Sequence, residues 1–118
     1  MSRDPYNTEV RQRFAAPAFA GRADTASRGR GQGVDIEFSA SCDDQRIASM
    51  RFRAYGCPHT IAACDLACEQ LEGQPLAALV SFSSDGLMRT LSVPVEKTGR
   101  ILVLEDALRD LNSRLESP

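Results

Sequence analysis

The chain has 118 residues, 42% of them hydrophobic, and its 14 lysines and arginines face 16 aspartates and glutamates, giving a formal net charge of −2. This length predicts one domain with a single core, and the charge balance argues against general nucleic-acid or membrane-surface binding. No stretch looks apolar enough to span a bilayer and no secretory signal is recognised, so we expect a cytoplasmic protein whose four cysteines stay reduced or bind metal.

The first 33 residues are expected to hold one short N-terminal helix and a flexible Gly/Arg-rich segment. Apolar residues at every fourth position predict a helix over residues 6–14, and Asn7 or Thr8 could cap its start. Residues 18–33 contain four glycines, which predict a mobile loop. An edge strand around residues 19–26 is the alternative for part of this segment.

The core of the domain is expected over residues 34–118 and begins with a β-hairpin. Apolar and polar residues alternate over residues 34–40 and again over 48–54, and the polar run CDDQ between them predicts a turn. This alternation leaves one apolar face for later helices to cover. We therefore expect an α+β fold, a single domain over residues 1–118, with a small antiparallel sheet of about three strands covered on one face by helices.

Helices are expected to make up the rest of the chain. Pro58 suits the first position of a helix and a glycine follows residue 72, so we expect a helix over residues 58–72 with Cys57 as its N-cap. A short helix is expected over residues 75–82, followed by a turn at SSDG. An apolar stripe predicts a C-terminal helix from residue 99 or 100 to residue 115.

The cysteines of the middle helix fall into two kinds. Cys64 and Cys68 share one helical stripe with apolar residues, so we expect them to be buried in the core. Cys57 lies instead at the helix mouth, where unpaired N–H groups favour a thiolate that binds a metal or attacks a sulfur donor. The plainer alternative is that Cys57 only caps the helix.

The only histidine, His59, lies in the first turn of the same helix. Such a histidine is either a packing or surface residue, or a ligand or base near neutral pH. A structural zinc site built from Cys57, Cys64, Cys68 and His59 is disfavoured, because the usual short Cys-x-x-Cys spacing is absent and His59 lies about 200° around the helix from Cys57.

The segment MRFRAYGCPHTIAACDLACEQLEG is a strand that ends in Tyr-Gly-Cys and enters a helix rich in small residues. It resembles the second-cysteine signature of the U-type iron–sulfur cluster assembly scaffolds, the family of IscU and the NifU amino-terminal domain. YNTEVRQRFAAPAFAG is similar to the family's opening helix, and VPVEK with LEDAL resembles its segment before and inside the closing helix. The resemblance covers nearly the whole chain and implies a carrier of an iron–sulfur cluster, not an enzyme.

Only one of the ligand cysteines of that family carries over to this chain. Cys57 matches the second cysteine, which implies an iron ligand or a persulfide acceptor. The first cysteine falls at Arg30 or a neighbouring residue, and the third falls at Arg100. Lys97 matches a lysine of the family's chaperone-binding loop, although the proline pair of that loop is broken here.

These departures leave three functions open. The first is a divergent scaffold or carrier, with Cys57 as persulfide acceptor or metal ligand, an iron–sulfur cluster or iron as cofactor, and a cysteine desulfurase or another assembly protein as partner, acting as a monomer or a homodimer. The second is a non-catalytic adaptor or regulator without cofactor, because one thiolate cannot supply the roughly four ligands of a conventional cluster. The third is a thiol- and anion-binding protein in which Arg30 and Arg100 converge on Cys57 and lower its pKa. The candidate site residues are thus Cys57, His59, Arg30 and Arg100.

Overall fold

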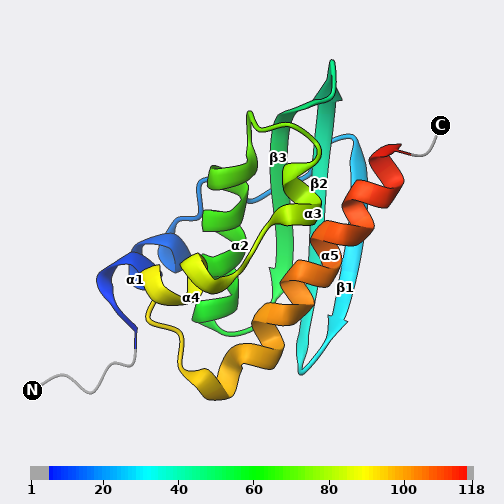
Figure 1. Ribbon diagram of the computed structural model, residues 1–118. Helices are drawn as coiled ribbons and strands as arrows, with labels where there is room; N and C mark the ends of the chain where they lie inside the picture. Colours follow the sequence, from blue (N-terminus) through cyan, green and yellow to red (C-terminus); the bar gives the residue numbers. More distant parts are fainter. Residues whose placement is uncertain (1–5, 117–118) are drawn as a thin grey trace, which may run out of the picture.

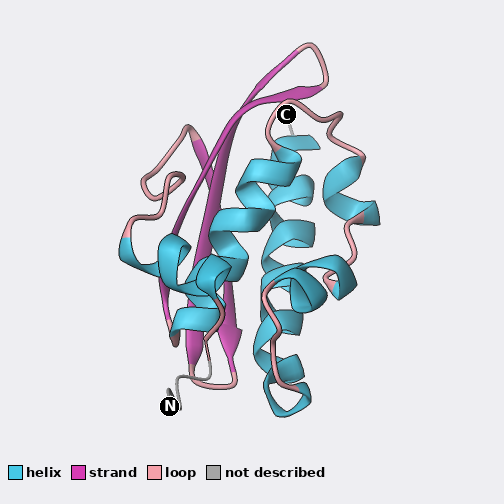
Figure 2. Cartoon of the chain, turned by 90° about the vertical axis from the view of Figure 1, so that its left-hand side faces the viewer, coloured by secondary structure: helices cyan, strands magenta, loops and turns pink. Residues whose placement is uncertain are grey.

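The protein, in a computed structural model that describes residues 6–116, is a three-stranded antiparallel sheet with helices packed on one face (Figure 1). The strands lie in the order β1 (Thr25–Gly31), β2 (Val34–Asp43) and β3 (Arg46–Tyr55). Helix α2 (Pro58–Leu71) packs on β3, and helix α5 (Thr98–Glu116) packs on β1 and β2. Figure 2 shows the long helices to one side of the sheet. The other face is only partly open, because the segment before β1 crosses it at Ser39, which is fully buried and accepts a hydrogen bond from the N–H of Ala23 at 2.8 Å. The predicted α+β fold is confirmed.

The N-terminal helix α1 (Thr8–Ala15) packs on α2 and starts as the sequence predicts. The side chain of Asn7 accepts a hydrogen bond from the backbone N–H of Val10 at 2.9 Å, which is an N-cap. A second attachment comes from Arg13, whose guanidinium lies 2.7 Å from the buried carboxylate of Asp65 on α2. The other oxygen of Asp65 accepts a hydrogen bond from the N–H of Phe19, so the chain beyond α1 is also held on α2.

The second half of the expected loop over residues 18–33 is strand β1. It pairs with β2 in continuous register from Thr25 opposite Ala40 to Gly31 opposite Val34. Its glycines serve close packing: a Cβ on Gly29 would lie 2.8 Å from the carbonyl oxygen of a residue of α5. The edge strand considered around residues 19–26 overlaps β1 only at its last two residues.

The β2–β3 hairpin forms as predicted, but its side-chain alternation differs at one end. Asp44 and Gln45 both have positive φ, as a two-residue hairpin turn requires. A register shift between Ser41 and Cys42 then changes which side chains face the helices. Ile47 is fully buried, whereas Ala48, which the alternation places inside, is exposed.

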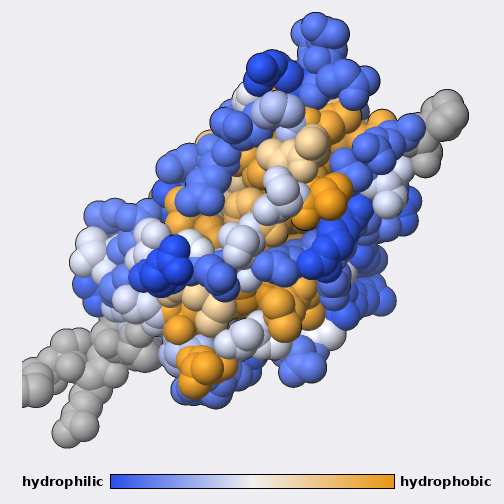
Figure 3. All heavy atoms as spheres, in the orientation of Figure 1, coloured by the Kyte–Doolittle hydropathy of each residue, from blue (hydrophilic) through white to orange (hydrophobic). Residues whose placement is uncertain are grey.

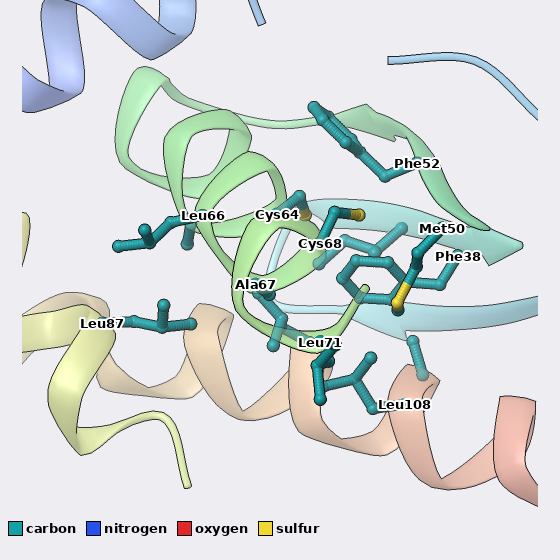
Figure 4. Close-up of a cluster of buried hydrophobic side chains, with 14 of the residues drawn as sticks. Phe38, Met50, Phe52, Cys64, Leu66, Ala67, Cys68, Leu71, Leu87 and Leu108 are labelled. Atoms are coloured by element: carbon teal, nitrogen blue, oxygen red, sulfur yellow. The ribbon is translucent and has the colours of Figure 1, made fainter. Parts of the chain in front are cut away.

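The core lies between the sheet and helices α2 and α5. Cys64 and Cys68 are completely buried, and both point from α2 toward Phe38, Met50 and Phe52 of the sheet (Figure 4). Their predicted packing role is therefore confirmed. Seen from the helical side, hydrophobic residues fill the middle of the surface and hydrophilic residues surround them (Figure 3).

Short helices connect α2 to α5. Helix α3 (Ala78–Ser81) is shorter than the helix expected over residues 75–82. Helix α4 (Asp85–Thr90) begins inside SSDG, where we expected only a turn, and the 3-10 helix η1 (Val95–Lys97) leads into α5. None of the helices in residues 6–116 is long and apolar enough to cross a membrane.

Other parts of the chain hydrogen-bond to both outer edges of the sheet, at several backbone groups of β3 and at one amide of β1. On β3, the N–H of Phe52 donates to the carbonyl of Phe19 and the N–H of Ile47 donates to the carbonyl of Gln74, each at 2.9 Å. On β1, the N–H of Arg28 donates to Asp110 of α5 at 3.3 Å.

Candidate functional site

The candidate site lies where β3 passes into α2, at Cys57. A Cβ on the preceding Gly56 would lie 3.0 Å from side-chain atoms of both Thr60 and Val34, so the chain turns tightly here and leaves little room for a larger residue. Cys57 is the N-cap of α2, with φ −78° and ψ 169°, and its side chain makes no capping hydrogen bond. The half-buried thiol therefore stands at the positive end of the helix, as the sequence predicts.

A lysine from a distant part of the chain contacts this thiol. The Nζ atom of Lys97, the last residue of η1, lies 3.5 Å from the Sγ atom of Cys57 and 2.9 Å from the Nδ1 atom of His59. The same ammonium group lies 5.4 Å from the centre of the Tyr6 ring. Lys97 thus joins Cys57 and His59, although the two side chains leave α2 in different directions.

His59 is buried and serves as an acceptor for the lysine. Its ring is fully buried and makes an edge contact with the Tyr6 ring, the two centroids lying 4.7 Å apart. An ammonium group can only donate, so Nδ1 accepts from Lys97 and the ring proton lies on Nε2, which has no hydrogen-bond partner among residues 6–116. Burial and the charge of Lys97 lower the pKa of His59, which favours this neutral form.

The surroundings of Cys57 favour its thiolate. Burial by itself raises the pKa of this thiol, but the hydroxyl and backbone N–H of Thr60, the side chain of Arg100 and the charge of Lys97 outweigh burial and bring the pKa to about 7. The Oγ1 atom of Thr60 lies 3.5 Å from the sulfur. A pKa of about 7 implies that about half of Cys57 is thiolate at neutral pH, and the thiolate is the reactive form of a cysteine.

The structure brings together three of the four residues selected from the sequence. Cys57, His59 and Arg100 all belong to this cluster. Arg30 lies on β1 instead, with its Nε atom 3.1 Å from a carboxylate oxygen of Asp35. The second cation at the thiol is Lys97, and the signal for it was its place in VPVEK just before the closing helix.

The side chains around Cys57 do not fit a conventional iron–sulfur cluster. Within residues 6–116, no three histidine, cysteine, aspartate or glutamate side chains come together in a way that could hold a metal ion. Cys57 and His59 are the donors present, and Nδ1 of His59 already accepts from Lys97. Lys97 and Arg100 offer protonated nitrogens without a free lone pair, so the roughly four ligands of a cluster cannot come from this site alone.

The chain, a small α+β fold with a thiol at a strand–helix junction, matches a known protein family. The model of the NifU-like N terminal domain family matches residues 3–111. The chain therefore belongs to this family, and the resemblance seen in the sequence is confirmed.

Two curated proteins are similar to the chain over most of its length. It is 24% identical over 117 residues to iron sulfur cluster assembly protein 1 of Trachipleistophora hominis, with 92% of this chain and 85% of that protein covered. It is 27% identical over 114 residues to the iron-sulfur cluster assembly protein IscU of Plasmodium falciparum, with 88% and 69% covered.

Solved structures share the fold at low sequence identity. A hypothetical protein superposes with a TM-score of 0.75 at 14% identity, covering 90% of this chain and 95% of its own. A putative iron-sulfur cluster assembly scaffold protein for the SUF system from Fervidobacterium islandicum gives 0.58 at 12% identity, covering 95% and 94%. The N-terminal part of a nitrogen-fixing NifU-like protein from Brucella abortus gives 0.56 at 7% identity, covering 92% and 88%.

Proposed function

We propose that this protein takes part in iron–sulfur cluster assembly as a sulfur acceptor and carrier, with Cys57 as the accepting residue. Membership in the NifU-like family and the two curated relatives support a place in assembly. The observation that carries the specific role is the Lys97 ammonium group 3.5 Å from the Cys57 sulfur, at the start of α2. A cation at this distance stabilises a thiolate, which is the nucleophile that sulfur transfer requires.

The proposed step is an exchange between a persulfide and a thiolate. The Cys57 thiolate attacks the terminal sulfur of a protonated persulfide on a cysteine desulfurase and forms a new sulfur–sulfur bond. The bond in the donor breaks, and its electron pair leaves with the inner sulfur as the donor's thiolate, so no oxidant or reductant is consumed. Lys97 and Arg100 then lie beside a persulfide on Cys57, where their charges favour its ionised form. The protein receives and hands on sulfur and is not an enzyme in this scheme.

The second candidate is an adaptor or regulator that binds a desulfurase or another assembly protein without accepting sulfur or holding a cluster. The observation that favours it is Arg100, which helps to lower the pKa of Cys57 and stands where the family resemblance places a ligand cysteine. In this function an iron–sulfur cluster is bound by the partners, and Cys57 only caps α2.

Mass spectrometry after sulfur loading separates the two functions. The protein is incubated with a cysteine desulfurase and L-cysteine, and in parallel with glutathione persulfide, which needs no protein contact. We expect Cys57 to gain one sulfur atom, Cys57→Ser to abolish this gain and Lys97→Gln to slow it.

Cys42 provides the matched control. Its side chain is exposed to reagents, and the partial desolvation of its sulfur raises the pKa of the thiol. Cys42→Ser should leave loading unchanged. A stable complex with the desulfurase in which Cys57 stays unmodified contradicts sulfur acceptance and supports the adaptor. Equal modification of Cys42 and Cys57 contradicts a dedicated site.

A further inference from the structure

The exposed part of the sheet face opposite α2 and α5 carries a patch of charged residues. The cross-strand register places Arg28 beside Glu37 and Glu37 beside Arg53, and it places Arg30 beside Asp35 and Asp35 beside Tyr55. We call this surface the arginine face. Its charged members are Arg22, Arg28, Arg30, Arg53, Asp35 and Glu37.

This patch is positive in a chain whose overall charge is negative. Four arginines face two carboxylates, so the arginine face has an excess of two positive charges, whereas the whole chain has a formal charge of −2. The nearby Arg51 does not add to this excess, because it pairs with Glu72 at 2.8 Å.

Two of the arginines keep their hydrogen-bonding capacity. Arg28 donates twice to Asp35, at 2.8 and 2.6 Å. Arg22 and Arg53 each approach Glu37 only to 3.9 Å, which is too long for a hydrogen bond. A guanidinium group has five N–H donors in a planar fork that suits a carboxylate. Arg22 and Arg53 are thus charged, largely exposed and available to an incoming acceptor.

The arginine face also has a recess that could hold a ligand and an exposed aromatic side chain beside it. A recess of about 310 Å³ is lined by Arg28, Asp35, Glu37, Arg53, Ala54 and Tyr55. Tyr55 is 77% exposed at its rim. Tyrosine and arginine are the residue types that dominate protein–protein contacts, whereas an exposed tyrosine of this size gains nothing for the fold.

We propose that the arginine face docks an acidic segment of a partner protein, whose carboxylates pair with Arg53 and Arg22 while an apolar side chain packs on Tyr55. Asp35 and Glu37 lie between the arginines and repel any anion placed over them, so the face suits a short segment whose separate carboxylates reach Arg53 and Arg22 better than a continuous phosphate backbone. A second copy in a symmetric contact would set two positive faces against each other. The inference does not depend on sulfur acceptance by Cys57, although Tyr55 is only two residues from Cys57 in the sequence.

An NMR titration with a synthetic peptide of alternating glutamate and tyrosine tests the docking. We expect the side-chain N–H signals of Arg53 and Arg22 and the ring signals of Tyr55 to shift in the unmodified protein, and the affinity to fall as salt is added. The double variant Arg22→Gln/Arg53→Gln should bind at least about tenfold more weakly, because it loses two charge-assisted contacts.

The control is the double variant Arg89→Gln/Arg109→Gln, which removes the same charge from exposed positions on α4 and α5 and should bind as the unmodified protein does. The same peptide with lysine in place of glutamate should not bind. Shifts that map to the helical side, an affinity equal in both double variants, or no shift of Arg53 overturn the proposal.

Two further probes separate other ligands. Tighter binding of a single-stranded oligonucleotide overturns the proposal in favour of nucleic acid, and an equal response to inorganic phosphate overturns it in favour of a general anion site. Thermal unfolding confirms that the double variants fold. Sulfur loading of Arg22→Gln/Arg53→Gln by glutathione persulfide should be unchanged, so a failure of docking remains distinct from a failure of the thiol.

Discussion

Four cysteines of one small protein have very different chemistry because of what surrounds each sulfur. Burial raises the pKa of Cys42, Cys64 and Cys68 above that of an ordinary thiol. For Cys57, the effects of Thr60, Arg100 and Lys97 outweigh burial and lower the pKa to about 7. The neutral ring of His59 holds the lysine by accepting its hydrogen bond, so it positions Lys97 without itself contacting a substrate.

Alkylation by iodoacetamide at different pH values tests the role of Lys97. In the unmodified protein the rate at Cys57 should reach half its maximum near pH 7. In Lys97→Gln this midpoint should move to higher pH, because losing a nearby cation removes a stabilising interaction of the thiolate and raises the pKa. Peptide mass spectrometry resolves Cys57 from Cys42, whose curve should not move. A Cys57 curve that is the same in both proteins contradicts the contact.

The sequence predicts part of this site, and the reason is local geometry. Pro58 fixes where the helix starts, and this places Cys57 at its N-cap. The contact of Lys97 with Cys57 spans 40 residues and depends on how η1 turns before α5, which no local pattern encodes. The prediction that Arg30 approaches the thiol comes from the family resemblance. The pairing of β1 with β2, which the sequence does not reveal, places Arg30 beside Asp35 instead.

The packing of β1 against α5 depends on one glycine. A Cβ on Gly29 would lie 2.8 Å from the carbonyl oxygen of Val103 and 3.1 Å from the Cβ of Ala107. Since α5 backbone must then move, Gly29→Ala should lower the free energy of unfolding by about 1–3 kcal/mol, as overpacking does. Urea unfolding followed by circular dichroism measures the change.

The matched control is Gly86→Ala in α4, where an added Cβ meets no atom within 4 Å. Alanine is the better helix former, so this variant should gain about 0.5–1 kcal/mol. Equal effects of the two substitutions would show that α5 does not approach β1 this closely.

Helix α1 is held by an ion pair that is almost completely buried. The carboxylate side chain of Asp65 is 2% exposed and the Arg13 side chain 13%. Arg13→Ala leaves this carboxylate without its cation and should cost about 3 kcal/mol of unfolding free energy, near the lower end for a broken buried pair. Chemical denaturation gives the value. The exposed Arg109→Ala should cost no more than about 0.5 kcal/mol, and a similar loss in both variants would argue against a special role for Arg13.

Periodicity predicts most of the elements and misses two features that arise from pairing. The alternation over residues 34–40 and the stripe of the closing helix both correspond to elements of the structure. Strand β1 has almost no alternating hydrophobic pattern, since Gly29 and Gly31 occupy its covered side while Arg28 and Arg30 face solvent. The register shift that buries Ile47 likewise depends on the partner strand.

For the whole molecule, the number of metal-donor side chains near Cys57 determines whether the protein can bind a metal ion there. Arg100→Cys would bring a second thiol toward Cys57, and two thiolates are donors of the kind zinc prefers, whereas Nδ1 of His59 stays engaged by Lys97. Zinc should then raise the melting temperature of this variant much more than that of the unmodified protein. Zinc at 100 times its dissociation constant stabilises a protein by about 2.7 kcal/mol.

Differential scanning calorimetry with and without zinc measures this stabilisation. Arg89→Cys is the control, because it adds a thiol at an exposed position of α4. Equal stabilisation of the two variants would contradict the placement of Arg100 beside the thiol.

The pairing of the β3 edge with other segments of the chain limits how this molecule can associate. Segments before β1 and after α2 already hydrogen-bond to the outer edge of β3. On the outer edge of β1, the side chain of Asp110 accepts a hydrogen bond from one backbone amide. Growth of the sheet from one molecule into the next, the route by which exposed strands seed fibrils, would first have to displace these groups. A partner strand therefore cannot add to β3 in the folded protein, and this edge should not drive the precipitation that bare edges cause.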